Sequence, residues 1–176
     1  MTTGFHYWKL VVNLVVSETI PMQTEISQLL SDTVIALFQA NGKLLEWGDA
    51  FTAPYGLTSA RWQILGAIAL ASHQLTAPQI AEQMGVSRQG AQKQLNLLLE
   101  DGLLEKLPNP SHLRSPLYRL STQGSALFER VNQAWQVHAA KSGAAFTEQA
   151  LATTLHTLRL IAQLHEIPPQ GEHDET

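Results

Sequence analysis

Cysteine is absent from this 176-residue chain, so disulfides, zinc–thiolate sites and thiol-based oxidant sensing are excluded. A membrane-length apolar run is also absent. The apolar stretch at 7–16 is interrupted by Lys9 and Asn13 and falls short of the roughly 20 residues that a membrane span needs. This stretch lacks the basic start and the small-residue cleavage site of a signal peptide. We therefore expect a protein with no membrane segment and a cytoplasmic location.

The chain also has no excess of positive charge, and its net charge is −4. The charges are nevertheless unevenly divided along the chain. Residues 57–124 hold six basic and four acidic side chains, whereas the remainder holds five basic and eleven acidic ones. The net charge is therefore +2 for the central segment and −6 elsewhere. For a nucleic-acid binder the distribution of charge matters more than its total, and here the positive balance lies in the central segment.

Patterns for catalysis and metal binding are lacking. No nucleophile–base pair, phosphate-binding loop or metal triad is recognisable, and we expect no enzyme activity. None of the seven histidines has a second histidine four residues away, and no cysteine or carboxylate cluster accompanies them. We therefore expect neither a metal site nor a cofactor.

Hydrophobic periodicity and breaker residues divide the chain into five parts. Residues 1–21 form an N-terminal arm or precede a start at Met22. A helix and connector occupy 22–56, and a winged helix-turn-helix occupies 57–124. Two helices follow over 125–167, and the acidic tail at 168–176 is expected to be disordered. The predicted fold class is mainly α with a small β-hairpin wing.

The helices that flank the central segment each carry an apolar stripe. The first is predicted from a Thr24 cap to about Gly48, with a kink or an interruption at Asn41–Gly42. The last starts at Thr147 and ends near Glu166. The apolar seams comprise Ile26, Leu29, Leu30, Leu37, Leu44 and Leu45 in the first helix and Leu151, Leu155, Leu158, Ala162 and His165 in the last. The small central lobe cannot cover both stripes, which favours a homodimer, although packing within one monomer is the alternative.

The central segment has the order of a helix-turn-helix followed by a hairpin. Thr76 is predicted to cap a helix over 77–84, and Gly85 supplies the left-handed turn after it. Ser87 then caps a helix over 88–101, and strands follow at 103–107 and 117–120. Thr122 is predicted to cap the next helix, which ends at about Lys141.

The helix at 88–101 has one apolar face and one polar face. The apolar positions are Ala91, Leu95, Leu98 and Leu99, and the opposite face near the N-terminus carries Arg88, Gln89, Gln92, Lys93 and Asn96. Arginine and lysine suit guanine edges and phosphates, whereas glutamine and asparagine suit adenine edges. An ordinary solvated face would also contain acids, and here none precedes Glu100. The pattern favours a helix that contacts DNA bases.

The hairpin tip between the two strands holds Pro108, Pro110 and Pro116, which stiffen it, and one arginine, Arg114. A rigid arm with one arginine suits a narrow minor groove, where the negative potential is deepest. The alternative is a surface loop with an incidental arginine. The full set of predicted DNA contacts is Ser87, Arg88, Gln89, Gln92, Lys93, Asn96, Lys106, His112, Arg114 and Arg119.

These motifs resemble the MarR family of winged helix-turn-helix transcriptional regulators over about residues 24–166. The resemblance is carried by LTSARWQIL, QIAEQMGVSRQGAQKQLNLLLEDGLLE and NPSHLRSPLYRLSTQG. The family's Leu-Thr-x-x-Gly signature corresponds to Leu120–Gly124, either without a gap and with Ser121 in place of threonine, or shifted by one residue to use Thr122. The family's Asp-x-Arg wing pattern has His112 in place of the aspartate. Arg114 is therefore expected to be held less firmly, or to be steered by backbone carbonyls.

The resemblance implies a cytoplasmic homodimer that binds a pseudo-palindromic double-stranded DNA operator through the winged helix, with the outer helices as the dimerisation lobe. It further implies a repressor that a small aromatic or anionic effector releases. The candidate effector pocket comprises Trp47, Phe51, Tyr55, Arg61 and Trp62, with core packing of Trp62 as the alternative. A winged helix that binds proteins without sequence-specific DNA binding is the competing function, which the net charge and the altered wing favour.

Overall fold

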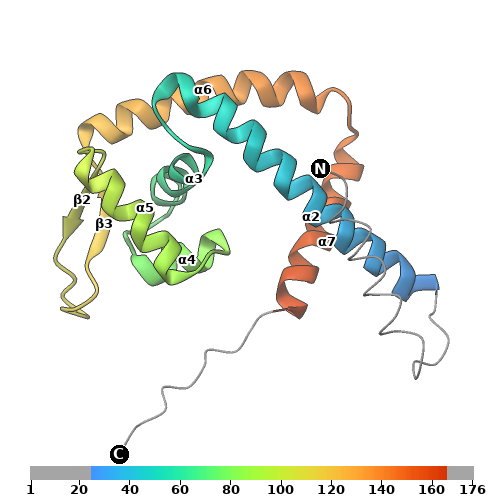
Figure 1. The fold of residues 1–176 in the computed structure, drawn as a ribbon, viewed down its shortest axis with the longest axis horizontal. Coiled ribbons are helices and arrows are strands. Elements are labelled where there is room, and N and C mark those ends of the chain that lie inside the picture. Colours follow the sequence, from blue (N-terminus) through green and yellow to red (C-terminus); the bar gives the residue numbers. More distant parts are fainter. Residues whose placement is uncertain (1–24, 166–176) are drawn as a thin grey trace, which may run out of the picture. The chain divides into compact units, whose positions relative to one another are not determined.

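A computed structural model describes residues 25–165, and the chain divides into two compact units, 1–60 and 61–176 (Figure 1). The predicted arm at 1–21, the Thr24 cap and the acidic tail at 168–176 lie outside the described residues.

The described residues of the first unit form one long helix, α2 (Glu25–Thr52), followed by the 3-10 turn η1 (Ala53–Tyr55). The predicted interruption at Asn41–Gly42 is wrong, because α2 is continuous there and extends beyond the predicted end at Gly48. A glycine costs a helix about 1 kcal/mol relative to alanine, which a 28-residue helix tolerates. Gly48 is required for another reason: a β-carbon at that residue would lie 2.5 Å from Ser59 Oγ.

The helix-turn-helix consists of α3 (Ser59–Ala69), α4 (Ala77–Met84) and α5 (Arg88–Glu100). The predicted caps are confirmed. The Thr76 N–H donates to Gln79 Oε1 at 2.9 Å in a capping box, and the Gly90 N–H donates to Ser87 Oγ at 3.0 Å. Gly85 has φ 63° and ends α4 in the left-handed conformation, which allows the sharp turn into α5.

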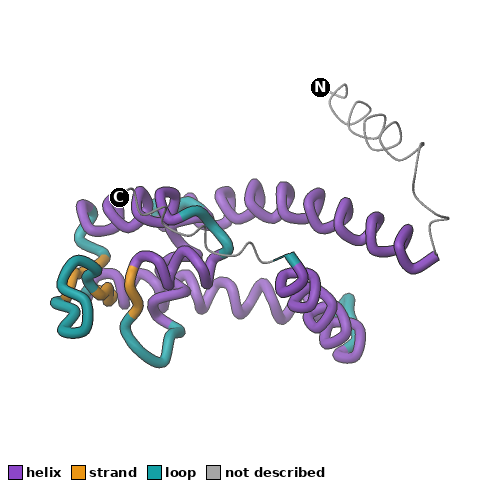
Figure 2. The backbone as a smooth tube through the Cα atoms, turned by 90° about the horizontal axis from the view of Figure 1, so that it is seen from below, coloured by secondary structure: helices purple, strands orange, loops and turns teal. Residues whose placement is uncertain are grey.

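A three-stranded antiparallel sheet completes the winged helix, with the order β1–β3–β2. The strands are β1 (Leu75–Thr76), β2 (Leu104–Leu107) and β3 (Leu117–Leu120), and Tyr118 of β3 pairs with Leu75 on one side and Lys106 on the other. The strands lie together at one end of the second unit, and the other regular elements among its described residues are helices (Figure 2). The predicted hairpin is confirmed.

The core of the winged helix receives side chains from each of its layers. The largest fully buried side chains there are Leu65 from α3, Ile80 from α4, Leu95 and Leu98 from α5, and Tyr118 from β3. Burial of each aliphatic side chain contributes about 1.5–3 kcal/mol to folding. These contacts fix α5 against the sheet by its apolar face, which leaves its polar face outward.

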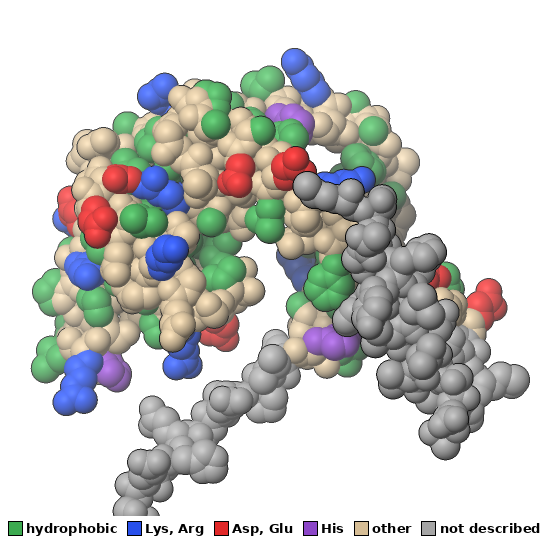
Figure 3. All heavy atoms as spheres, in the orientation of Figure 1, with side chains coloured by type: hydrophobic (Ala, Val, Ile, Leu, Met, Phe, Trp, Pro, Cys, Tyr) green, Lys and Arg blue, Asp and Glu red, His purple; other side chains and the backbone are tan. Residues whose placement is uncertain are grey.

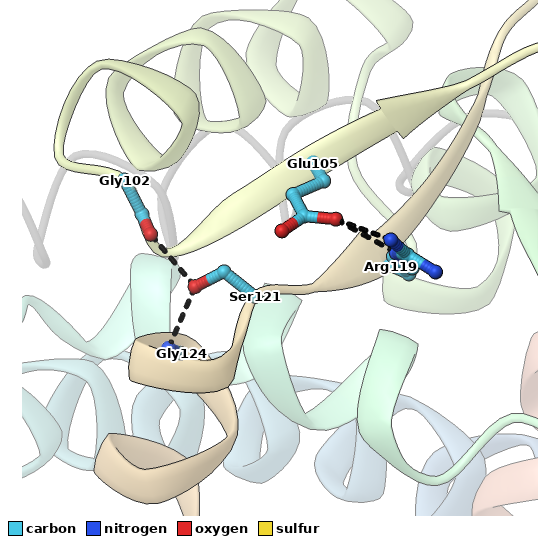
Figure 4. A network of polar contacts seen from close by, with 5 residues as sticks. All are labelled: Gly102, Glu105, Arg119, Ser121 and Gly124. Carbon is cyan, nitrogen blue, oxygen red and sulfur yellow. Dashed lines mark hydrogen bonds and ion pairs between the residues drawn. The ribbon is translucent and has the colours of Figure 1, made fainter.

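Two further helices follow, α6 (Thr122–Gly143) and α7 (Glu148–Leu164). The predicted cap of α6 at Thr122 is wrong by one residue, because the Gly124 N–H donates to Ser121 Oγ at 2.9 Å (Figure 4). The same hydroxyl donates to the carbonyl of Gly102 at 2.7 Å and so joins the end of α5 to the start of α6. The predicted cap of α7 at Thr147 is confirmed.

Candidate nucleic-acid interface

The polar face of α5 is presented at the surface of the second unit. Arg88, Gln89, Lys93 and Asn96 are exposed, and Gln92 is half-buried. The Ser87 cap fixes the first turn, where free backbone N–H groups and the helix dipole create partial positive charge. A phosphate group placed there would be stabilised by the backbone as well as by basic side chains.

Gln92 is held by two side chains of the second unit. Its Nε2 donates to Asn96 Oδ1 at 2.9 Å and to the Tyr118 hydroxyl at 3.4 Å. Tyr118 is only 1% exposed, so its ring belongs to the core, and its hydroxyl contacts the polar face of the helix. Sequence reasoning missed this tyrosine, although the alternation of side chains along a strand offered a signal that it faces inward.

The hairpin tip is braced by its own polar groups. Asn109 Nδ2 donates to the Ser115 carbonyl at 2.8 Å, and Asn109 Oδ1 accepts from the Ser111 N–H at 3.1 Å. His112 and Arg114, which are separated by Leu113, are both exposed, and basic and histidine side chains lie at the end of the hairpin (Figure 3). Among the described residues Arg114 has no hydrogen-bond or ion-pair partner. His112 thus leaves the arginine without the carboxylate that the family pattern supplies.

The hairpin strands carry the remaining predicted contacts, and one of them is engaged within the protein. Arg119 pairs across the strands with Glu105, with Nη2 and Oε2 2.7 Å apart and a hydrogen bond from Nε at 2.8 Å (Figure 4). Both partners are about half exposed. This pair partly neutralises Arg119, whereas Lys106 on β2 is exposed and makes no such pair within the described chain.

The predicted effector residues are divided between the units. In the first unit Trp47 and Phe51 stack along α2 with ring centroids 4.9 Å apart, and Tyr55 lies in η1. In the second unit Arg61 forms an ion pair with Asp101, the C-cap of α5. The side chain of Arg61 is 15% exposed, so its charge is largely committed to this ion pair.

Trp62 lines a cavity of about 380 Å³ within the second unit. Its ring meets that of Trp135 edge-on, with centroids 5.6 Å apart. The walls come from α3, α4 and α6, and the lining residues are Trp62, Gln63, Gly66, Ala67, Leu70, Gln83, Met84, Phe128, Asn132 and Trp135. Three carboxamides supply the polar side chains, and no charged side chain belongs to this lining. Only Trp62 of this set was predicted from the sequence, because apolar cavity walls and cores use the same residue types.

Two further observations concern the described residues only. No group of three or more histidine or carboxylate side chains there is arranged to hold a metal ion. Nor does the described part contain a helix with the length and apolar character to cross a membrane.

Known proteins resemble this winged helix in sequence. The model of the MarR family matches residues 55–115. An uncharacterized protein of Mycobacterium tuberculosis is 35% identical over 138 residues, which cover 78% of this chain and 92% of the relative.

Two solved structures share the fold. A crystal structure of a MarR family transcription regulator superposes with a TM-score of 0.66 and 25% identity over 78% of this chain and 93% of that chain. A mutant of MarR from Escherichia coli complexed with operator DNA gives a TM-score of 0.63 and 22% identity over 79% of this chain and 99% of that one. The chain therefore belongs to the MarR family and has the winged-helix fold of its transcription regulators.

Proposed function

We propose that this protein is a dimeric, sequence-specific DNA-binding transcriptional regulator that acts in the cytoplasm. The observation that carries the proposal is the polar face of α5, which starts at a capped N-terminus and holds no carboxylate before Glu100. Such a helix fits the major groove, and the adjacent hairpin brings Arg114 to the neighbouring minor groove. The similar fold of the operator complex of Escherichia coli MarR supports this placement.

The proposed dimer is supported by apolar side chains that the single chain leaves exposed. On α2, Ile26 is 78% and Phe38 73% exposed, and on α7 Leu151 and Leu155 are 47% and 48% exposed. Water contact with so much apolar surface is unfavourable, and a second copy would bury it. A two-fold dimer would present two copies of α5 to half-sites about one helical turn of DNA apart.

The proposed regulation is a repressor that a small aromatic effector releases, with the cavity beside Trp62 and Trp135 as its site. The carboxamides of Gln63, Gln83 and Asn132 offer hydrogen bonds to neutral ligand groups. A ligand acts only if it binds one arrangement of the recognition helices better than the other. Quenching of tryptophan fluorescence by an aromatic ligand, lost when both Trp62 and Trp135 are replaced by phenylalanine, would support the site, and quenching retained in that double variant would place the ligand elsewhere.

The DNA-binding surface is tested by substitution of Arg114. We expect Arg114→Ala to weaken binding to duplex DNA of any sequence and to lower the slope of log affinity against log salt by about 1, since one phosphate-proximal charge is removed. Fluorescence anisotropy with a labelled duplex at several salt concentrations measures both quantities.

Arg159→Ala on the exposed side of α7 removes the same charge away from the winged helix and serves as the matched control. Equal affinity and equal salt slope for both variants would contradict the proposed surface. Absence of DNA binding by the wild-type protein at low salt would instead favour the protein-interaction function.

A further inference from the structure

Gln92 and Asn96 lie one turn apart on the outward side of α5 and form a single hydrogen-bonded pair. The distance from Gln92 Nε2 to Asn96 Oδ1 is 2.9 Å, which is a good hydrogen bond between side chains four residues apart. Asn96 is exposed and Gln92 is half-buried, so the pair lies where the helix surface meets the sheet. The two carboxamides therefore have a fixed mutual orientation before any ligand arrives.

Tyr118 supports this pair from the central strand of the sheet. Its hydroxyl lies 3.4 Å from Gln92 Nε2, and its ring is almost completely buried. The backbone of Tyr118 is paired on both sides, with Leu75 in β1 and Lys106 in β2. Because the backbone and ring of Tyr118 are held in place, its hydroxyl restricts the rotation of the Gln92 side chain, which would otherwise be free at a helix surface.

The hydrogen bonds that remain available to a ligand follow from those already made. The Nε2 of Gln92 is directed to Asn96 and Tyr118, which leaves its Oε1 as an acceptor. Asn96 accepts through Oδ1 and keeps its Nδ2 as a donor. Within the described part of the chain neither Oε1 of Gln92 nor Nδ2 of Asn96 has a partner. The pair thus presents one acceptor beside one donor.

Among the bases in a major groove, adenine matches that combination. It offers the N6 amino group as a donor and N7 as an acceptor, whereas guanine offers two acceptors at O6 and N7. Guanine would place its O6 acceptor opposite the Oε1 acceptor of Gln92, and neither oxygen would receive a hydrogen bond. Thymine lacks a donor on its major-groove edge, and cytosine lacks an acceptor there.

We propose that Gln92 and Asn96 together recognise one adenine in the operator, with Gln92 Oε1 accepting from N6 and Asn96 Nδ2 donating to N7. Tyr118 is a positioning residue that holds Gln92 in this orientation. The proposal rests on the proposed DNA-binding function and adds the base that is recognised, the two side chains that share it, and the residue behind them.

The test begins with a duplex selected by the wild-type protein from a random DNA library. Each A·T pair is changed to G·C in turn, and Kd is measured by fluorescence anisotropy for the wild type and for Gln92→Ala, Asn96→Ala and the double variant. One adenine should be favoured over guanine by about 5- to 150-fold in the wild type, the range of a good bidentate contact. Either single variant should lose most of this preference, and the double variant should lose little more.

Two modified bases separate the contacts. 7-Deazaadenine lacks N7 and should weaken binding by the wild type but not by Asn96→Ala. Purine lacks the N6 amino group and should weaken binding by the wild type but not by Gln92→Ala. Loss of specificity at two different base pairs in the two single variants would overturn the shared contact.

Tyr118→Phe removes only the hydroxyl and should reduce the preference for adenine by about 2- to 10-fold, the range of one modest hydrogen bond, with an unchanged salt slope. Ser142→Ala in α6 removes a hydroxyl elsewhere in the second unit and is the control, which should leave the preference intact. An unchanged preference in Tyr118→Phe would overturn the role of the tyrosine. Failure of the wild type to enrich any sequence would overturn the proposed function itself. Enrichment of a sequence in which no adenine is recognised through Gln92 and Asn96 would overturn this inference alone.

Discussion

At the scale of single residues, a nearby backbone carbonyl group explains why residue 124 is a glycine. A β-carbon at this residue would overlap the carbonyl oxygen of Leu103, which also accepts the Ser121 N–H at 3.0 Å. The backbone of α6 therefore approaches the connection between α5 and β2 more closely than any other residue type allows. This contact gives a physical reason for the glycine of the Leu-Thr-x-x-Gly signature.

We expect Gly124→Ala to lower the free energy of unfolding by about 1–3 kcal/mol, the usual cost of an overpacked site. The overlapping atom is part of the backbone and cannot rotate away. Gly143→Ala in the same helix is the control, since a β-carbon there would meet nothing within 4 Å beyond its neighbours and its own helix backbone, and it should be neutral or slightly stabilising. Urea unfolding followed by circular dichroism measures both, and equal stability of the two variants would contradict the close approach.

At the scale of elements, the caps determine where α4, α5 and α6 begin. Thr76 and Ser87 were correctly predicted because a small hydroxyl residue preceded a clear apolar period. At α6 two hydroxyl residues are adjacent, and the sequence pattern alone favoured Thr122. The structure selects Ser121, since its hydroxyl reaches both Gly102 and Gly124.

We expect Ser121→Ala to lower the free energy of unfolding by about 0.5–2 kcal/mol, because a helix N-cap is lost. Thr122→Ala should change it by less than about 0.5 kcal/mol, since residue 122 is exposed. Thermal or urea unfolding of the two variants compares adjacent hydroxyl residues directly. A larger loss for Thr122→Ala would show that the cap lies at the threonine after all.

Long-range contacts account for what sequence analysis did not find. The helix-turn-helix and the hairpin were predictable because their apolar periods and turn glycines are local signals. The contact of Gln92 with Tyr118 joins residues 26 positions apart, and the cavity draws its walls from three helices. Arg61 was predicted beside an anionic effector, but its ion pair with Asp101 depends on how α3 packs near the end of α5. No pattern within one element encodes such contacts.

At the scale of the whole molecule, the apolar seams of α2 and α7 argue for a dimer. The seam residues Leu151 and Leu155 are nearly half exposed on α7, although Ile161 of the same helix is buried. A helix with a second apolar side that its own chain leaves uncovered is suited to a partner helix. Dimerisation would also relate two copies of α5 by a two-fold axis, which a palindromic operator requires.

We expect the wild-type protein to sediment as a dimer and Leu155→Arg to shift it toward the monomer, because a charge in the seam cannot be paired or hydrated there. Thr153→Arg lies on the opposite side of α7 and should remain dimeric. Sedimentation velocity over a range of concentrations gives the mass of each variant, and circular dichroism checks that both retain their helices. A monomeric wild type would contradict the proposed assembly.

The symmetry of the selected DNA tests the central claim most directly. Full-length protein is used to select duplexes from a random library in the presence of excess competitor DNA, and the enriched sequences are determined. The account predicts an inverted repeat whose half-sites have centres about 10–10.5 base pairs apart, one for each α5 of a dimer. Enrichment of no sequence over the starting library would contradict specific DNA binding, and enrichment of a single unrepeated site would contradict the two-fold arrangement.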